Sequence, residues 1–174
     1  TAQAQDKVLN LYSARHYQTD DLMYETFTKT TGIKINRVDA DDAGIVARLR
    51  AEGSASPADV VLLVDAARLV VADSQGLFQP FKSAKLDATI PAKLRAAPGP
   101  DGVTWTGFST RARVVVYDPK RVQAQDVATY EQLADPKLKG LLCTRSGSHP
   151  YNLSLFSTVV ERLGDQKGEA WLKG

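Results

Sequence analysis

The first hundred residues alternate between short apolar runs and longer stretches with apolar residues at helical spacing. The apolar runs predict three strands: Val8–Tyr12, Ile33–Val38 and Ala58–Leu63. The last of them is continuously apolar, as in a strand buried on both faces. The amphipathic stretches, each followed by a glycine, predict three helices: 16–31, 42–52 and 66–75. This alternation predicts an α/β fold with a mostly parallel sheet.

Ligands of open α/β sheets bind beyond the carboxyl ends of the strands. The loop Ser13–Tyr17 follows the first predicted strand, and Asp65 follows the third. Both are therefore expected at the ligand-binding edge.

The pattern changes after Ala96. A turn-rich stretch precedes elements of less regular spacing: extended segments at 105–108 and 114–117, a short helix at 130–138, a strand at 140–144 and a long helix at 148–163. One strand cannot make a stable sheet. We therefore interpret the chain as the N-terminal portion of a two-lobed protein. Residues 1–117 would form one α/β lobe with hinge strands at about 105–117, and residues 118–174 would begin an incomplete second lobe.

Composition narrows the class of protein. The 174 residues are 43% hydrophobic and 24% charged, which is typical of a globular chain and not of a disordered, collagen-like or disulfide-rich one. No apolar run approaches the ~20 residues of a membrane helix. A net charge of +2 gives no electrostatic footprint for nucleic acid. The single cysteine, Cys143, excludes an internal disulfide and is interpreted as a buried apolar residue.

Two aromatic and basic clusters could carry chemistry. His16 and Tyr17 together offer an imidazole nitrogen and a phenolate oxygen, which are good ligands for a transition metal. Helix capping or packing would account for the same pair. Ser146–Asn152 has the Ser, Gly and Pro of a helix start, which suits either an anion site of free backbone N–H groups or an ordinary cap.

Arg111 and Arg113 alternate in an extended segment, so they are expected on one face, where a guanidinium could bind a carboxylate or carbonate. A solvated strand edge is the alternative. The chain has no sequence motif of a hydrolase, phosphate loop, dinucleotide site or redox pair. The carboxylates Asp20, Asp21, Asp39, Asp41 and Asp42 are interpreted as helix-capping residues.

Six segments in order along the chain carry a resemblance to a known family: Leu11–Tyr17, Ser56–Val60, Gly76–Pro80, Thr110–Tyr117, Tyr130–Gly140 and Arg145–Asn152. Together they resemble the periplasmic ferric-ion-binding proteins of bacterial ABC iron importers, in the tyrosine-rich subgroup. The resemblance extends over the whole of this chain. It corresponds to about the first half of a family member. It implies a periplasmic-binding-protein-like fold of two α/β lobes joined by a hinge.

The resemblance also implies a function and a site. The protein would be a carrier and not an enzyme, taking Fe³⁺ into the cleft between its lobes and delivering it to an ABC permease and its ATPase in the inner membrane. His16, Tyr17 and Tyr151 would be metal ligands, with two further tyrosines beyond Gly174. Arg111, with Arg113 second, would hold carbonate or another small anion. A monomer in the periplasm is expected, and the start at Thr1 without Met fits a removed signal peptide, although a chain merely lacking its Met would look the same.

Three other functions fit parts of the sequence. A binding protein for a polyamine, thiamine or an organic anion would share the fold without needing both tyrosines. An α/β enzyme could use His16 with Asp65 for acid–base chemistry, but no nucleophile motif accompanies them. A ligand-sensing lobe of a longer chain is the third.

Overall fold

The computed structural model describes residues 7–15 and 17–174. The chain divides into two compact units, Thr1–Phe108 and Ser109–Gly174, here called unit 1 and unit 2. Each unit is considered by itself. No helix among the described residues is long and apolar enough to cross a membrane.

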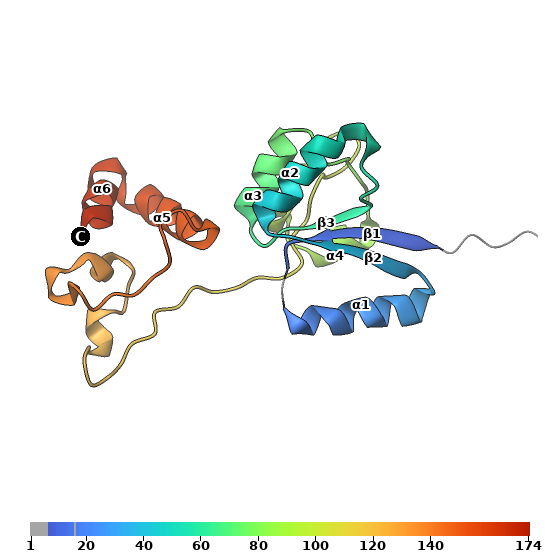
Figure 1. The fold of residues 1–174 in the computed structure, drawn as a ribbon. Coiled ribbons are helices and arrows are strands. Elements are labelled where there is room, and N and C mark those ends of the chain that lie inside the picture. Colours follow the sequence, from blue (N-terminus) through green and yellow to red (C-terminus); the bar gives the residue numbers. More distant parts are fainter. Residues whose placement is uncertain (1–6, 16) are drawn as a thin grey trace, which may run out of the picture. The chain divides into compact units, whose positions relative to one another are not determined.

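Unit 1 is built on a parallel sheet of three strands, β1 (Val8–Ser13), β2 (Lys34–Asp39) and β3 (Val60–Leu62). The strand order is β2-β1-β3, so β1 is central (Figure 1). Leu11 of β1 lies opposite Arg37 of β2 and Val60 of β3. The predicted α/β fold with a parallel sheet is confirmed for unit 1.

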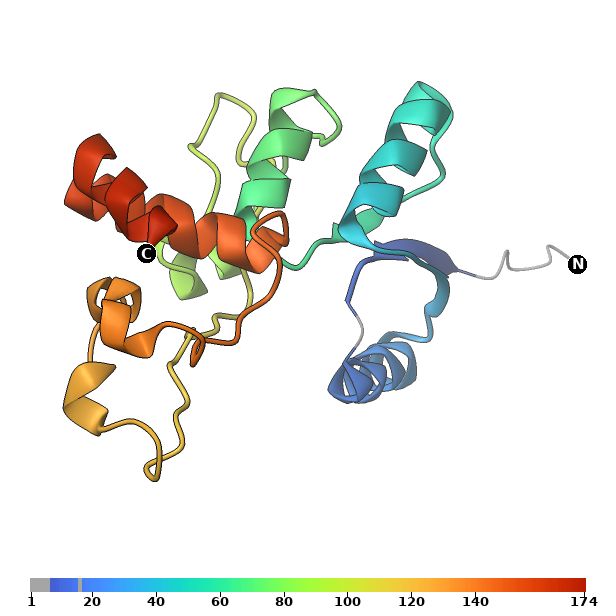
Figure 2. The same cartoon turned by 60° about the vertical axis from the view of Figure 1, so that its left-hand side comes forward.

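Helices cover both faces of this sheet. Helix α1 (Gln18–Thr31) lies on one face, and α2 (Asp42–Glu52) and α3 (Ala66–Ser74) lie on the other (Figures 1 and 2). The chain moves from β1 to β2 in one direction and from β2 to β3 in the opposite one. Right-handed crossovers therefore place α1 and α2 on opposite faces. The carboxyl end of β1 is thus a topological switch point, where ligands bind in such sheets.

The core of unit 1 lies between the sheet and the helices α2 and α3. Its buried residues are Tyr12, Ala14, Ile45, Leu49, Leu63 and Ala72. Leu11 is also buried, and alternation along the strand directs it to the face that α1 covers. The central strand is buried on both faces, which fixes the position of the loop that follows it.

The predicted helices of unit 1 are confirmed with small changes at their ends. Helix α2 has the predicted bounds, α3 ends one residue early, and α1 begins at Gln18 instead of His16. Gly32 ends α1 with a φ of 70°, a left-handed conformation that glycine adopts without strain. A short helix, α4 (Ala84–Thr89), was not predicted.

Unit 2 contains two helices, α5 (Pro150–Leu163) and α6 (Asp165–Lys173), preceded by short 3₁₀ turns. The helix predicted at 130–138 is wrong. Two 3₁₀ turns, Glu131–Ala134 and Pro136–Leu138, replace it, because Pro136 keeps Asp135 extended at φ −64° and ψ 129°.

The strand predicted at 140–144 is also wrong, since these residues are assigned to no strand. No strand of unit 2 is present to pair with it in the described part of the chain. Cys143 is exposed, contrary to the expectation of a buried residue. Of the two extended segments predicted, the first contains the bridge of Thr106 to Arg95, and the second pairs with no strand.

Candidate metal-ligand residues

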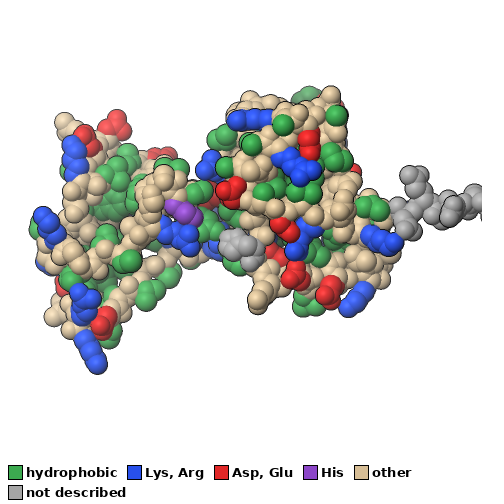
Figure 3. All heavy atoms as spheres, in the orientation of Figure 1, with side chains coloured by type: hydrophobic (Ala, Val, Ile, Leu, Met, Phe, Trp, Pro, Cys, Tyr) green, Lys and Arg blue, Asp and Glu red, His purple; other side chains and the backbone are tan. Residues whose placement is uncertain are grey.

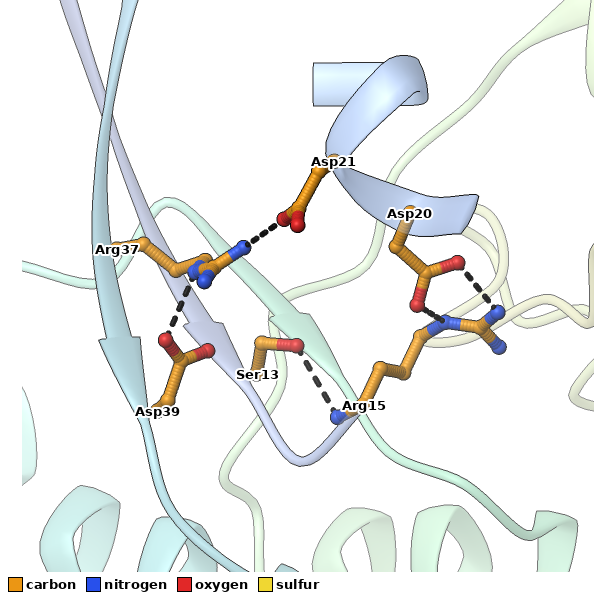
Figure 4. Close-up of polar contacts among 6 residues, drawn as sticks. All are labelled: Ser13, Arg15, Asp20, Asp21, Arg37 and Asp39. Carbon is orange, nitrogen blue, oxygen red and sulfur yellow. Dashed lines mark hydrogen bonds and ion pairs between the residues drawn. The ribbon is translucent and has the colours of Figure 1, made fainter. Parts of the chain in front are cut away.

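The loop after β1 is anchored on both sides by backbone hydrogen bonds. The Ala14 N–H donates to the Leu62 carbonyl at 2.8 Å, and the Ala40 N–H donates to the Ser13 carbonyl at 3.2 Å. The buried Ser13 hydroxyl accepts from the Arg15 N–H at 3.1 Å (Figure 4). These bonds join the ends of the three strands and fix the backbone that leads to Tyr17.

Tyr17 lies at the N-cap of α1 with extended backbone, and its side chain is half-buried. Its carbonyl accepts the Asp20 N–H at 3.0 Å, the first hydrogen bond of the helix. Tyr17 therefore lies at the carboxyl edge of the sheet, as the sequence predicts. His16, the other ligand predicted in this loop, lies outside the described residues.

Arg15 and Asp20 form a two-pronged ion pair in the same loop. The Arg15 Nε and NH2 groups donate to the two carboxylate oxygens of Asp20, each at 2.8 Å (Figure 4). The hydrogen bonds to Asp20 raise the pKa of Arg15 above its ordinary value, against the opposing effect of burial. The interpretation of Asp20 as a cap is therefore incomplete, because its carboxylate is buried against the guanidinium.

A second, more exposed pair joins α1 to β2. Arg37 donates to Asp21 at 2.8 Å and to Asp39 at 2.7 Å (Figure 4). These hydrogen bonds, that to Asp21 first, raise the pKa of Arg37. Its guanidinium carbon also lies 5.4 Å from the centroid of the Tyr24 ring. Among the predicted capping carboxylates, Asp41 does cap its helix, accepting the Gly44 N–H at 2.7 Å.

Tyr151 of unit 2 lies in the first turn of α5. Pro150 opens the helix, and His149 caps it by accepting the Tyr151 N–H on Nδ1 at 3.2 Å. The rings of His149 and Tyr151 meet edge-on with centroids 4.7 Å apart. The alternative of a site of free backbone N–H groups is wrong for this helix start, because the Ser148 and Tyr151 N–H groups are bonded within it.

Three arginines surround the Tyr151 ring. Arg111 donates to the Tyr151 hydroxyl at 2.8 Å. The guanidinium carbons of Arg111, Arg113 and Arg145 lie 4.6, 3.7 and 5.9 Å from the ring centroid. The predicted placement of Arg111 and Arg113 on one face is thus confirmed within unit 2. Basic side chains gather beside the histidine of unit 2 in the space-filling view (Figure 3).

Two groups that the sequence analysis did not assign hold this arrangement. The buried Asn152 side-chain amide donates to the carbonyls of Arg145 and Ser146, at 2.5 and 3.3 Å. The Tyr130 hydroxyl donates to the Arg113 carbonyl at 2.6 Å. Arg145 itself was also missed as a neighbour of Tyr151, although it lies in the same sequence segment, four residues before His149.

Among the residues that the structure describes, no three His, Cys, Asp or Glu side chains are grouped to hold a metal ion. Asp65, at the end of the third strand, caps α3 by accepting the Ala67 N–H at 2.9 Å. Tyr17 of unit 1 and Tyr151 of unit 2 each have an arginine beside the ring. Phenolate oxygen is a hard ligand that suits a small, highly charged cation.

Comparison with known proteins matches this chain to a protein family. The model of the bacterial extracellular solute-binding proteins matches residues 23–165. Iron uptake protein A1 of Synechocystis sp. is 46% identical over 166 residues, which cover 95% of this chain and 45% of that protein.

Two solved structures are also similar. The FutA protein of Trichodesmium in complex with iron and citrate is 44% identical, with a TM-score of 0.82, over 95% of this chain and 51% of that one. The ferric binding protein of Campylobacter jejuni is 35% identical, with a TM-score of 0.84, over 94% of this chain and 51% of that one. The chain thus spans about half the length of these proteins.

Proposed function

Because the chain belongs to the family of bacterial extracellular solute-binding proteins, we propose that its complete protein captures ferric iron outside the cytoplasm and delivers it to an ABC importer. The proposal is supported by relatives that are named for iron uptake and ferric binding. The protein is a carrier: iron is its cargo and leaves unchanged.

His16, Tyr17 and Tyr151 are the proposed iron ligands in this chain. Fe³⁺ is small and hard, so phenolate oxygens suit it. A free tyrosine has a pKa of about 10, and a bound cation favours the deprotonated form. Iron binding therefore releases protons and weakens on acidification. The observation that carries this assignment is Tyr151, whose hydroxyl accepts a hydrogen bond from Arg111 while two more arginines lie beside its ring.

The arginines beside Tyr151 have a second proposed task. Arg111 and Arg113 can bind a small anion such as carbonate next to the iron, because a guanidinium presents paired donors to a planar oxyanion. Fe³⁺ and the guanidinium groups are all positively charged, so the bound anion would reduce the repulsion between them.

Release of iron requires the ligands to separate. We assign residues 1–117 to one lobe with its hinge at about 105–117, and residues 118–174 to the start of the second lobe. In this scheme Tyr17 and Tyr151 belong to different lobes, so closing joins them on the iron and opening parts them. The carrier acts as a monomer in the periplasm, where its partners are the permease and ATPase of the inner membrane, and it binds no nucleic acid.

Single substitutions in the complete protein test the ligand assignment. Tyr17→Phe and Tyr151→Phe each remove one ligand oxygen and are expected to weaken ferric binding by more than about 100-fold, since even outer-shell partners of a metal are worth about 10- to 100-fold. The measurement is iron affinity by competition with a chelator. Tyr24→Phe is the matched control, because Tyr24 also lies beside an arginine but is not a proposed ligand. Unchanged affinity in both ligand variants would refute the assignment.

A further inference from the structure

The Arg15 side chain is held in one orientation. Its two hydrogen bonds to Asp20 fix both the position and the plane of the guanidinium (Figure 4). The side chains of Arg15 and Asp20 are only 13% and 10% exposed. Little water could therefore solvate either charge if the pair separated. Separating the two side chains would leave uncompensated charges in a poorly solvated place, and this cost keeps them paired.

Two aromatic rings lie against this fixed guanidinium. The Arg15 guanidinium carbon is 5.1 Å from the centroid of the Tyr17 ring and 4.9 Å from that of the Phe108 ring. Both distances lie within the range in which a cation attracts the face of a ring. The half-buried Tyr17 side chain therefore contacts a group that cannot move freely.

The same two residues also hold Tyr17 through the backbone. The Asp20 N–H donates to the Tyr17 carbonyl at 3.0 Å, while the Asp20 carboxylate holds Arg15. The Arg15 N–H is in turn anchored to the Ser13 hydroxyl at the end of β1. Arg15, Asp20 and Tyr17 thus form a closed set of contacts attached to the central strand of the sheet.

We propose that Arg15 is a positioning residue for Tyr17, which holds the tyrosine ring in the orientation that binds iron. The inference rests on the proposed function and deepens it. A ligand that is already oriented loses less conformational entropy when the metal binds, so affinity rises without an added ligand atom. Asp20 acts through Arg15 and has no contact with the metal in this scheme.

The chain offers a matched control in Arg37. It has the same chemistry as Arg15: hydrogen bonds to carboxylates, here Asp21 and Asp39, and a guanidinium near a tyrosine ring, that of Tyr24. Tyr24 is not a proposed ligand. A general effect of losing an arginine–carboxylate pair near α1 would therefore appear in both variants, and an effect through Tyr17 in only one.

The experiment compares Arg15→Ala, Arg15→Lys and Arg37→Ala in the complete protein loaded with Fe³⁺. The readouts are ferric affinity and the visible phenolate-to-iron absorption band. We expect Arg15→Ala to weaken ferric binding about tenfold and to shift the absorption band. The variant loses the contact between the guanidinium and the Tyr17 ring, so the Tyr17 side chain is no longer held in one orientation. Arg15→Lys should lose most of the affinity too, because an ammonium cannot form the two-pronged pair. Arg37→Ala should change neither readout.

A double variant shows whether the effect runs through Tyr17. In a Tyr17→Phe background, Arg15→Ala should cause little further loss of affinity, since the ligand it positions is already gone. A further loss as large as in the wild type would overturn the inference, and so would an unchanged affinity and band in Arg15→Ala. If Arg15→Ala does not fold, Asp20→Asn replaces it, because this variant keeps the volume but sets an amide donor against the guanidinium. An unchanged band in that variant would overturn the inference as well.

Failure of the inference is distinct from failure of the proposed function. A wild-type protein that shows no phenolate-to-iron band contradicts the iron site itself, and the role of Arg15 falls with it. A wild-type band that Arg15→Ala leaves unaltered contradicts only the role of Arg15.

Discussion

At the scale of single residues, tyrosine has three different roles in this chain. Tyr12 is buried in the core and donates its hydroxyl to Glu52 at 2.8 Å. Tyr130 donates to the Arg113 carbonyl and so holds the segment beside α5. Tyr17 and Tyr151 instead lie at helix starts, Tyr17 at the N-cap of α1 and Tyr151 in the first turn of α5. Position in the fold, and not residue type, separates the proposed ligands from the structural tyrosines.

Glu52 gives a pH-dependence that can be measured. Its carboxylate accepts hydrogen bonds from Ser56 and Tyr12 and pairs with Arg48 at 2.7 Å. The Ser56 hydrogen bond, followed by that from Arg48, lowers the pKa of Glu52 below its ordinary 4.5. A lowered folded-state pKa means that the stabilising effect is complete above pH 4.5 and is lost as the pH falls through the folded-state value.

We therefore expect Glu52→Gln to reduce the dependence of stability on pH in the acid range. Urea unfolding at a series of pH values between about 3 and 6 measures it. Glu161→Gln is the control, because Glu161 is an exposed carboxylate on α5. Identical pH slopes for wild type and Glu52→Gln would show that the Glu52 contacts do not stabilise the folded state.

At the scale of elements, the two units differ in how well the sequence predicts them. The strands β1 to β3 and the helices α1 to α3 have apolar residues in short runs or on one side, because these elements pack in regular layers. The strand predicted at 140–144 failed for a non-local reason: an apolar run forms a strand only if another strand pairs with it. Leu141 and Leu142 line a pocket of about 510 Å³ in unit 2, so these apolar side chains border open space.

The packing of α5 against α6 depends on a glycine. Phe156 and Trp171 meet edge-on across the two helices, with centroids 5.7 Å apart. Gly168 is buried there, and a Cβ at this position would lie 2.9 Å from the Val160 Cα. Such a distance is too short for two carbon atoms, so the helices would have to separate.

Gly168→Ala is therefore expected to destabilise the protein by about 1–3 kcal/mol, although alanine favours helix more than glycine does. Denaturant unfolding followed by far-ultraviolet circular dichroism measures the loss. Gln166→Ala, at an exposed position of the same helix, should change the stability by less than about 0.5 kcal/mol. An increase in stability for Gly168→Ala would mean that α5 and α6 are not packed this closely.

The residues of the candidate site were predicted unevenly from the sequence. Tyr17, Tyr151, Arg111 and Arg113 were assigned from short segments that resemble a family, and their roles stay predictions. Asp20 and Arg145 were not assigned, because the local sequence does not show that their side chains lie against Arg15 and the Tyr151 ring. Asp20 is also at a position where an ordinary cap explains a carboxylate, so its sequence context concealed the pairing with Arg15.

At the scale of the whole molecule, the proposed iron site requires ligands from both units. Each unit contributes one proposed tyrosine ligand, and the chain spans about half the length of relatives that are named for iron uptake or ferric binding. The iron-carrier proposal therefore concerns the complete protein.

One measurement tests that proposal most directly: a visible absorption spectrum of the complete protein while Fe³⁺ is added as a weak chelate at neutral pH. Phenolate-to-iron charge transfer gives a strong colour that carboxylate and imidazole ligands do not. We expect a band that saturates at one iron per molecule and that Tyr17→Phe and Tyr151→Phe shift or abolish. A wild-type protein that stays colourless, or a band that both variants retain unaltered, would contradict it.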